Sequence, residues 1–273
     1  MCIRDSFGIE HGPNIPQNLL RYHAAMQPIA LITGASRGIG AATALSLAQA
    51  GYAVAVNYRD HSLAADEVVR SIRASGGTAI SVQADVADEA QVLAMFAKVD
   101  AKLGRLCALV NNAGVVDVAC KVEAMSTARL QRMLMTNVLG SMVCAREAVR
   151  RMSTLHGGSG GAIVNLSSVA ATLGSPGQYV DYAASKGAID TFTVGLAREV
   201  ATEGIRVNAV RPGIVDTEIH ASGGQPDRAQ RLASQIPMQR PGTAQEIANA
   251  IVWLLSDAAG YTTGAILDVG GGR

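Results

Sequence analysis

The stretch GQYVDYAASK, residues 177–186, carries two tyrosines and a lysine where a helix is predicted. Tyr182 and Lys186 are four positions apart, so both side chains lie on one helix face and reach the same small volume. An ammonium about 4 Å from a phenolate, at an effective dielectric of about 20, is worth roughly 4 kcal/mol, or about 3 pKa units at most. That would bring the pKa of a phenol from about 10 towards neutrality, where a general acid works best. The spacing therefore predicts proton transfer by Tyr182.

The other tyrosine of this stretch, Tyr179, is seven positions from Lys186, about 10.5 Å of helix rise if the helix extends that far after Pro176 and Gly177. Only Tyr182 is therefore within reach of the lysine, and we expect Tyr179 to form a wall of the substrate pocket. An ordinary amphipathic helix is the alternative interpretation, because Y-x-x-x-K alone is a common pattern. Its place after a serine-bearing strand end favours chemistry.

A glycine-rich turn, TGASRGIG (33–40), follows the first apolar run of the chain. Glycines let a backbone turn tightly and approach a phosphate, and the following helix N-terminus attracts an anion. The spacing is G-x-x-x-G-x-G rather than G-x-G-x-x-G, and a plain strand-to-helix turn is the alternative. Its position in a βαβ unit favours dinucleotide binding. The predicted contacts in this turn are Gly34, Ser36, Arg37, Gly38, Ile39 and Gly40.

The second apolar run ends in NYRD, at the place where NAD sites usually carry an acidic residue for the ribose 2′-hydroxyl. Asn57 occupies that place, and two guanidinium groups, Arg37 and Arg59, could flank a 2′-phosphate in fork geometry. NADP(H) is favoured, although Asn57 would also tolerate NAD(H) and both arginines could be solvated loop charges. The predicted contacts at this strand end are Asn57, Tyr58 and Arg59.

Two more short motifs, ADV (84–86) and NNAG (111–114), follow the third and fourth apolar runs. Sheets of parallel strands bind ligands beyond the carboxyl ends of their strands, so both motifs are placed for the adenosine half of the cofactor. Small residues would let the backbone pass close to it, with Asn111 and Asp85 holding that geometry; turn chemistry alone is the alternative. The predicted contacts here are Asp85, Val86, Asn111, Ala113 and Gly114.

The elements that must position these residues follow from hydrophobic periodicity. From Pro28 onward, short apolar runs alternate with longer segments of helical period, which is typical of βαβ units. Such units form an α/β fold: a doubly wound parallel sheet with helices on both faces. The seven predicted strands span 29–33, 53–57, 79–83, 106–110, 162–167, 206–210 and 265–269.

Composition narrows the classes of partner. The 273 residues include 23 Lys plus Arg and 22 Asp plus Glu, with no basic run, so nucleic acid is not an expected partner. No apolar run reaches the roughly 18 residues of a membrane span, and no signal peptide is recognisable, so we expect a cytoplasmic protein. The four cysteines lack C-x-x-C spacing and the five histidines form no ligand pattern, which predicts no metal site.

The N-terminal segment differs from the rest of the chain. We expect residues 1–25 to be a non-native or disordered extension, because the first six, MCIRDS, match the translation of a DNA-library transposase adapter. Met26 would then be the native start, and residues 26–273 one domain.

Four motifs together resemble the short-chain dehydrogenase/reductase family in its single-domain form of about 250 residues: TGASRGIG, NNAG, YAASK and RPGIVDT (211–217). The resemblance covers about residues 28–273 and is closest to ketoacyl reductase-like and glucose-dehydrogenase-like enzymes. It implies a Rossmann-type fold, a nicotinamide cofactor, hydride exchange between a carbonyl or alcohol substrate and that cofactor, and a homotetramer.

The resemblance also assigns roles to individual residues. The family's tyrosine and lysine fall on Tyr182 and Lys186, its serine on Ser168 and its asparagine on Asn137. Tyr182 would protonate the substrate oxygen, Ser168 would orient that oxygen, Lys186 would hold the ribose hydroxyls, and Asn137 would keep a relay water. Ser168 and Tyr182 are 14 positions apart, one more than in many relatives, and the extra residue falls in a loop where insertions are cheap.

The segment after the sixth predicted strand would complete the site. Pro212 and Gly213 would lie near the nicotinamide, and the Ile214 N–H and the Thr217 hydroxyl would meet its carboxamide. Residues 218–242 are predicted to be a substrate lid, in which His220 is either a substrate contact or solvated.

Two other functions compete with this one. HGGSGG (156–161) contains the G-x-S-x-G of a hydrolase nucleophile elbow, but that motif needs a strand before it and a helix after it, the reverse of the predicted order. A non-catalytic dinucleotide-sensing protein on the same fold is the second alternative. The lid composition leaves the substrate and the working direction open.

Overall fold

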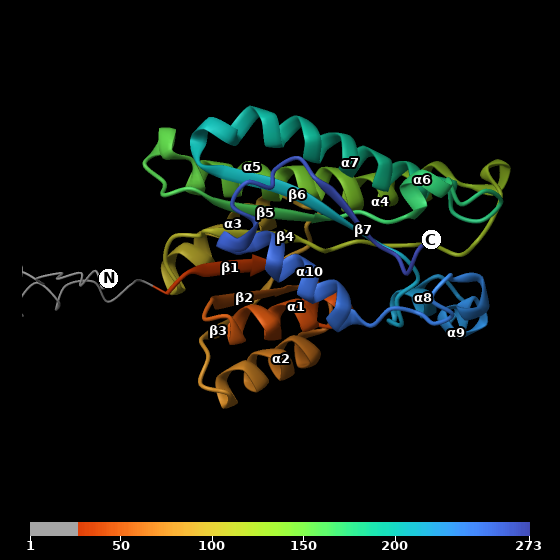
Figure 1. Cartoon of the computed structure of the whole chain (residues 1–273), viewed down its shortest axis with the longest axis horizontal. Coiled ribbons are helices and arrows are strands. Elements are labelled where there is room, and N and C mark those ends of the chain that lie inside the picture. Colours follow the sequence, from red (N-terminus) through yellow and green to blue (C-terminus); the bar gives the residue numbers. More distant parts are fainter. Residues whose placement is uncertain (1–26) are drawn as a thin grey trace, which may run out of the picture.

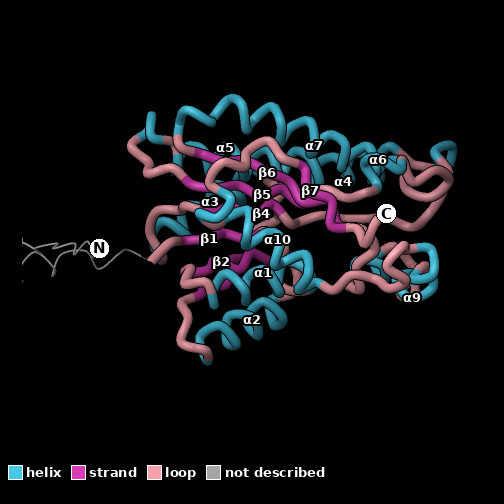
Figure 2. Tube along the Cα trace, in the orientation of Figure 1, coloured by secondary structure: helices cyan, strands magenta, loops and turns pink. Residues whose placement is uncertain are grey.

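A parallel sheet with helices on both faces forms the body of the molecule (Figures 1 and 2). The computed structural model describes residues 27–273, so the expectations for residues 1–25 and for a start at Met26 fall outside the described residues. All strand pairs are parallel, in the order β3-β2-β1-β4-β5-β6-β7. The strands are β1 (Ile29–Ile32), β2 (Ala53–Tyr58), β3 (Ala79–Gln83), β4 (Ala108–Asn111), β5 (Gly161–Leu166), β6 (Ile205–Pro212) and β7 (Ile266–Val269).

The helices cover the sheet because each strand buries both of its faces. In β1, Ile29 and Leu31 pack against the helices of one face, and Ala30 and Ile32 against those of the other. Helices α3, α5 and α7 cover the first face, and α1, α2 and α10 the second. The helices are α1 (Gly38–Gln49), α2 (Ser62–Ala74), α3 (Glu89–Lys102), α4 (Thr127–Leu134), α5 (Gly140–Met152), α6 (Ala170–Leu173), α7 (Val180–Val200), α8 (Ile219–Ser222), α9 (Arg228–Arg231) and α10 (Ala244–Leu255). The predicted Rossmann-type, doubly wound seven-stranded fold is confirmed.

The largest differences between predicted and observed strand boundaries, two residues each, are at the start of β4 and the end of β6. β4 begins at Ala108 rather than at 106, and β6 continues to Pro212 because Arg211 and Pro212 pair with β7. The extra β6 residues carry the sheet directly into the segment predicted to face the nicotinamide.

The segment predicted to be a lid contains only short helices, α8 and α9, beside the sheet end (Figure 1). Its two ends are tied together, because Gly242 donates to the Ile214 carbonyl and accepts from the Asp216 N–H, each at 2.9 Å. A small buried hydrophobic cluster beneath it consists of Ile214, Ala229 and Ile236. The segment is therefore anchored at its base and has a core of its own.

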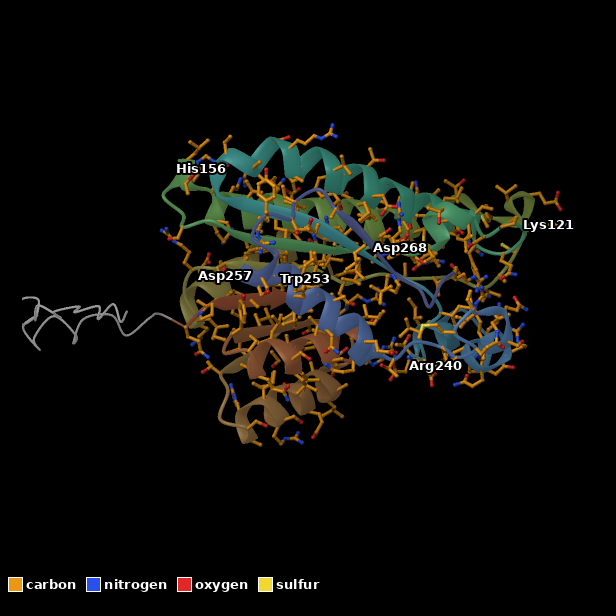
Figure 3. All side chains as sticks on the ribbon, in the orientation of Figure 1. Lys121, His156, Arg240, Trp253, Asp257 and Asp268 are labelled. Carbon is orange, nitrogen blue, oxygen red and sulfur yellow. The ribbon has the colours of Figure 1, made fainter. Side chains whose placement is uncertain are left out.

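The glycine-rich HGGSGG connection runs from α5 into β5, which begins at Gly161. Figure 3 shows His156 at the opposite end of the molecule from Arg240, which belongs to the segment predicted to be a lid. The helix-then-strand order of the sequence analysis is confirmed, and it is the wrong order for a nucleophile elbow. Within residues 27–273, no helix has the length and apolar character to cross a membrane, and no cluster of metal-ligating side chains occurs.

Candidate active site

Two adjoining pockets open at the carboxyl ends of the strands. Asn112, Gly114 and Thr217 line both of them, so the pockets form one continuous site. The first pocket contains Ser168, Tyr182 and Lys186. The second contains most of the predicted cofactor contacts: Gly34, Ser36, Arg37, Gly38, Ile39, Asn57, Tyr58, Arg59, Asp85, Val86, Ala113, Gly114 and Thr217.

The glycine-rich turn (33–40) packs against the NNAG segment (111–114). Gly34 has a φ of +61°, and a Cβ there would lie 2.9 Å from the Ala113 Cα. A Cβ on Gly40 would lie 2.5 Å from the Asn112 Nδ2, so only glycine fits at either position. The Thr33 hydroxyl accepts from the Asn112 and Ala113 N–H groups, at 3.0 Å each. These contacts hold the residues after β1 and β4 together, and both segments form the floor of the second pocket.

Helix α1 begins at this floor without a side-chain cap, since Arg37 at its N-cap makes no capping hydrogen bond. The N–H groups of its first turn and the positive end of its dipole would therefore face an anion bound in the pocket. This geometry fits the pyrophosphate of a dinucleotide, and Gly34, Gly38 and Gly40 would let the backbone approach it closely.

Asn57 is buried and joins three strand ends. Its Oδ1 accepts from the Gly34 N–H at 3.0 Å, and its Nδ2 donates to the carbonyls of Val82 and Ala84 at 3.2 and 3.1 Å. Both ends of the amide are therefore occupied by backbone. The chain carries asparagine here because a carboxylate could not donate to those two carbonyls.

The two predicted phosphate-binding arginines both line the second pocket. Arg37 is exposed, whereas Arg59 is held by Asp60 at 2.6 Å and lies 4.0 Å from Asp85. The Arg59 side chain is still 52% exposed, so its guanidinium remains accessible to a ligand.

Two predicted cofactor contacts, Gly40 and Asn111, do not line either pocket. Asn111 is buried in β4, where its Nδ2 donates to the Ser141 carbonyl at 3.0 Å and to the Asn165 Oδ1 at 2.9 Å. Successive strand residues point to opposite faces, so the following Asn112 lines the pockets instead. The Asn111 side chain therefore lies away from both pockets, and its contact with a cofactor stays a prediction. Asn112, which the sequence analysis did not name, lines both pockets.

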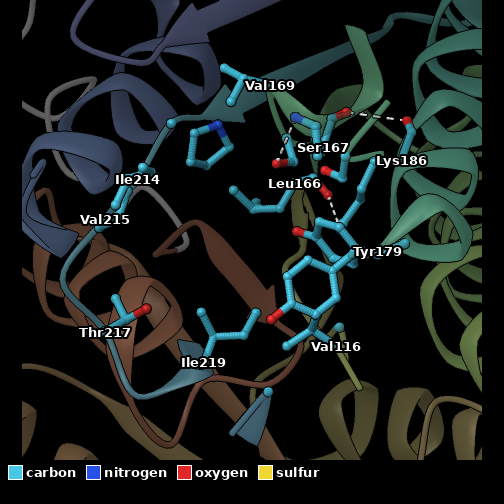
Figure 4. Close-up of a pocket in the computed structure, with 18 of the residues that line it drawn as sticks. Val116, Leu166, Ser167, Val169, Tyr179, Lys186, Ile214, Val215, Thr217 and Ile219 are labelled. Carbon is cyan, nitrogen blue, oxygen red and sulfur yellow. Dashed lines mark hydrogen bonds between the residues drawn. The ribbon is translucent and has the colours of Figure 1, made fainter. Parts of the chain in front are cut away.

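Tyr182 and Lys186 come together as their spacing predicts, and Ser168, which the resemblance assigned, lines the same pocket. Ser168 lies close enough to the Tyr182 phenol for its hydroxyl to favour the phenolate. The Lys186 Nζ lies 5.7 Å from the centre of the Tyr182 ring and donates to the Leu166 carbonyl at 2.6 Å. Figure 4 shows Lys186 and Tyr179 on one side of the pocket, opposite Ile214, Val215, Thr217 and Ile219.

These contacts do not produce the predicted lowering of the Tyr182 pKa. Burial raises the pKa of Tyr182, and the hydrogen bond from Ser168 only partly offsets that effect. Burial also lowers the pKa of Lys186 to about 8, which the nearby Asp190 carboxylate opposes. Removing both groups from water disfavours the phenolate and the ammonium, and this cost dominates their pKa shifts.

Asn137 lies in a π-helical turn, Met135–Leu139, between α4 and α5. Its side chain is fully buried and brackets Val115, accepting from its N–H at 2.8 Å and donating to its carbonyl at 3.0 Å. Its Nδ2 also lies 3.1 Å from the Ser185 Oγ. Single π turns are frequent at functional sites, and this one ties Asn137 to both the NNAG segment and α7.

A buried ion pair supports the first turn of α7. Arg129 of α4 donates to both carboxylate oxygens of Asp181, at 2.7 and 3.1 Å, and to the Val118 carbonyl at 2.5 Å. Asp181 directly precedes Tyr182. The partners are 52 positions apart, so no local pattern could have paired them.

The remaining wall of the first pocket is mostly apolar. Pro212, Gly213, Ile214 and Thr217, whose contact with the nicotinamide stays a prediction, line this pocket. Tyr179 also lines it, together with Val116, Val169, Leu173, Val215 and Ile219. The Tyr179 hydroxyl accepts from Gln225 of the predicted lid at 2.6 Å. A substrate here would contact apolar groups on most sides and polar groups at Ser168 and Tyr182.

Comparison with known proteins agrees with this geometry. Residues 34–273 match the family model described as Enoyl-(Acyl carrier protein) reductase. The chain is 61% identical to the uncharacterized oxidoreductase YgfF of Escherichia coli over 90% of this chain and 99% of that protein. It is 40% identical to the 3-oxoacyl-[acyl-carrier-protein] reductase FabG of Staphylococcus aureus over 90% of this chain and 98% of that protein.

A solved structure shares the fold and much of the sequence. A short chain dehydrogenase from Burkholderia cenocepacia, in complex with NADP, superposes with a TM-score of 0.83 at 35% identity, over 90% of this chain and 98% of that one. Because the family model and these relatives match nearly the whole described chain, the protein belongs to the short-chain dehydrogenase/reductase family of oxidoreductases, on its ketoacyl reductase-like side.

Proposed function

We propose that the protein is an NADP(H)-dependent oxidoreductase that interconverts a carbonyl and an alcohol, with Tyr182 as general acid and base. The observation that carries this proposal is that Ser168, Tyr182 and Lys186 line one pocket, which is continuous with the pocket of the glycine turn. The relative named as a 3-oxoacyl reductase supports the reaction class. A cytoplasmic homotetramer stays a prediction.

Each residue of the site would have a separate role in carbonyl reduction. A bound nicotinamide would supply the hydride to the carbonyl carbon. Tyr182 would donate its phenolic proton to the carbonyl oxygen, and Ser168, which lines the same pocket, would donate to the same oxygen and hold it in place. Lys186 would donate to ribose hydroxyls and stabilise the phenolate that remains. Asn137 would keep the backbone of Val115 in position at the pocket edge.

A substrate screen tests the proposal. We expect at least one aldehyde, ketone, oxo acid or 3-oxoacyl thioester to be reduced with NADPH, or the matching alcohol to be oxidised with NADP. A protein that binds the dinucleotide but is inert toward the whole panel would instead support the sensing function.

The cofactor preference should rest on Arg37 and Arg59. We expect wild-type kcat/KM to be at least about tenfold higher with NADPH than with NADH, because guanidinium groups bind a phosphate through charge-assisted hydrogen bonds. The variant Arg37→Ala/Arg59→Ala should lose about ten- to a hundredfold with NADPH and change little with NADH. Arg70→Ala, an exposed arginine of α2 outside the pocket, is the control. A wild-type preference for NADH would refute this assignment.

The lowered pKa of Lys186 predicts that cofactor binding takes up protons. Free protein with a lysine pKa of about 8 is mostly neutral at this side chain at pH 9, and donation to the ribose favours the ammonium. Affinity should therefore fall as the pH rises above 8, and binding at pH 9 should take up as much as about 0.9 proton. Calorimetry in buffers of different ionisation enthalpy measures this uptake. Lys186→Met should abolish it, and a wild type without uptake at pH 9 would contradict the prediction.

A further inference from the structure

The charged side chains around the first pocket are all cations. Among the described lining residues these are Lys186, Arg228 and Arg273, and none of the lining residues is Asp or Glu. Lys186 is buried and donates to the Leu166 carbonyl, and Arg273 is exposed at the last position of the sequence. Arg228 differs from both, because it is part-buried and comes from the predicted lid.

Arg228 is held in place by neutral partners. Its guanidinium carbon lies 5.1 Å from the centre of the Tyr179 ring, and its Nη1 donates to the Gln178 Oε1 at 2.8 Å. The neighbouring carboxylate, Asp227, lies 3.8 Å from Arg231 instead. No carboxylate of the described residues forms an ion pair with Arg228, so its charge at the pocket is not neutralised by the chain.

The contacts that fix Arg228 also connect it to Tyr179. Gln225 accepts weakly from Arg228 at 3.4 Å and donates to the Tyr179 hydroxyl at 2.6 Å. Tyr179 stands three positions before Tyr182, and both rings line the same pocket. A guanidinium held in one orientation loses less conformational entropy when it binds a planar anion, and an apolar surround strengthens that bond.

From this arrangement we infer that Arg228 binds a carboxylate of the substrate, so that the natural substrate is a small oxo acid or hydroxy acid. This inference rests on the proposed function and names its substrate class. The apolar wall between Tyr182 and the lid would hold the carbon chain, with the reacting carbonyl at Tyr182 and the carboxylate at Arg228.

The test compares acids with their neutral esters. The probes are 4-oxopentanoate, 5-oxohexanoate and 6-oxoheptanoate, each beside its methyl ester, with NADPH as reductant. We expect kcat/KM for at least one acid to exceed that of its ester by about tenfold or more in the wild type. Arg228→Gln should lower the value for that acid about tenfold or more, through KM, and leave the ester within about threefold. Arg228→Lys should retain part of the acid preference.

The ester is an internal control for folding. Arg240→Gln is the matched control, because Arg240 belongs to the predicted lid but does not line the pocket (Figure 3), and this variant should keep the preference for the acid. Equal wild-type values for acids and esters, or equal losses for both in Arg228→Gln, would overturn the inference and leave the proposed function standing. A wild type inert toward every acid and ester, and toward the wider carbonyl panel, would overturn both.

Discussion

Tyr182→Phe should lower kcat for carbonyl reduction by about a thousandfold or more, while the Kd for the cofactor stays within about threefold. The substitution removes the phenolic proton and little volume, and general acid catalysis typically contributes about 10²- to 10⁴-fold. Tyr182 lines the first pocket with Ser168 and has Lys186 beside its ring, so no other described side chain is equally placed to donate that proton. Steady-state kinetics with the best substrate of the panel, and fluorescence titration with NADPH, measure the two quantities.

Tyr179→Phe is the matched control for this experiment. Tyr179 lines the same pocket, but its hydroxyl accepts from Gln225 and belongs to the lid side. We expect it to change the relative kcat/KM of different substrates more than the maximum rate. Equal losses in the two phenylalanine variants would refute the division of roles between the tyrosines.

Arg129→Met should destabilise the protein by about 3 to 5 kcal/mol. The Asp181 side chain is only 2% exposed, and the substitution would leave its carboxylate buried without a partner. Asp181 is in the first turn of α7, directly before Tyr182, so activity should also fall in the fraction that remains folded. Urea unfolding followed by circular dichroism measures the change in the free energy of unfolding.

Two further variants separate burial of the charge from loss of packing. Arg129→Met/Asp181→Leu should recover much of the lost stability, because it removes the unpaired charge. Arg132→Met, on the same helix, breaks an exposed pair with Asp117 and should cost less than about 1 kcal/mol. Equal destabilisation in the Arg129 and Arg132 variants would contradict a special role for the buried pair.

The fold follows from the sequence because strands buried on both faces leave a clear pattern of apolar runs. The runs that became β1 and β2 are continuous, and their alternate residues pack against opposite helix layers. The sequence predicts the ends of strands less accurately than their positions, because pairing with a neighbouring strand decides where each strand stops. Arg211 and Pro212 extend β6 only because β7 lies beside them.

Individual side chains were harder to place than the elements that carry them. Asn111 and Asn112 are adjacent and chemically identical, and only the pleat of β4 decides which one lines the pocket. The spacing of Tyr182 and Lys186 predicted their proximity, but not the depth of burial that raises one pKa and lowers the other. The Arg129–Asp181 pair joins two helices distant in sequence, and Arg228 reaches Tyr179 only through the fold of the predicted lid.

Transfer of deuterium from the nicotinamide is the most direct test of hydride transfer linked to Tyr182. Wild-type protein is incubated with an accepted carbonyl substrate and NADPH that is stereospecifically deuterated at C4. When the transferred position is labelled, the alcohol should carry one deuterium on the former carbonyl carbon. Tyr182→Phe should form this alcohol about a thousandfold more slowly. An alcohol without deuterium from both labelled stereoisomers, or equal rates in the two proteins, would contradict the account.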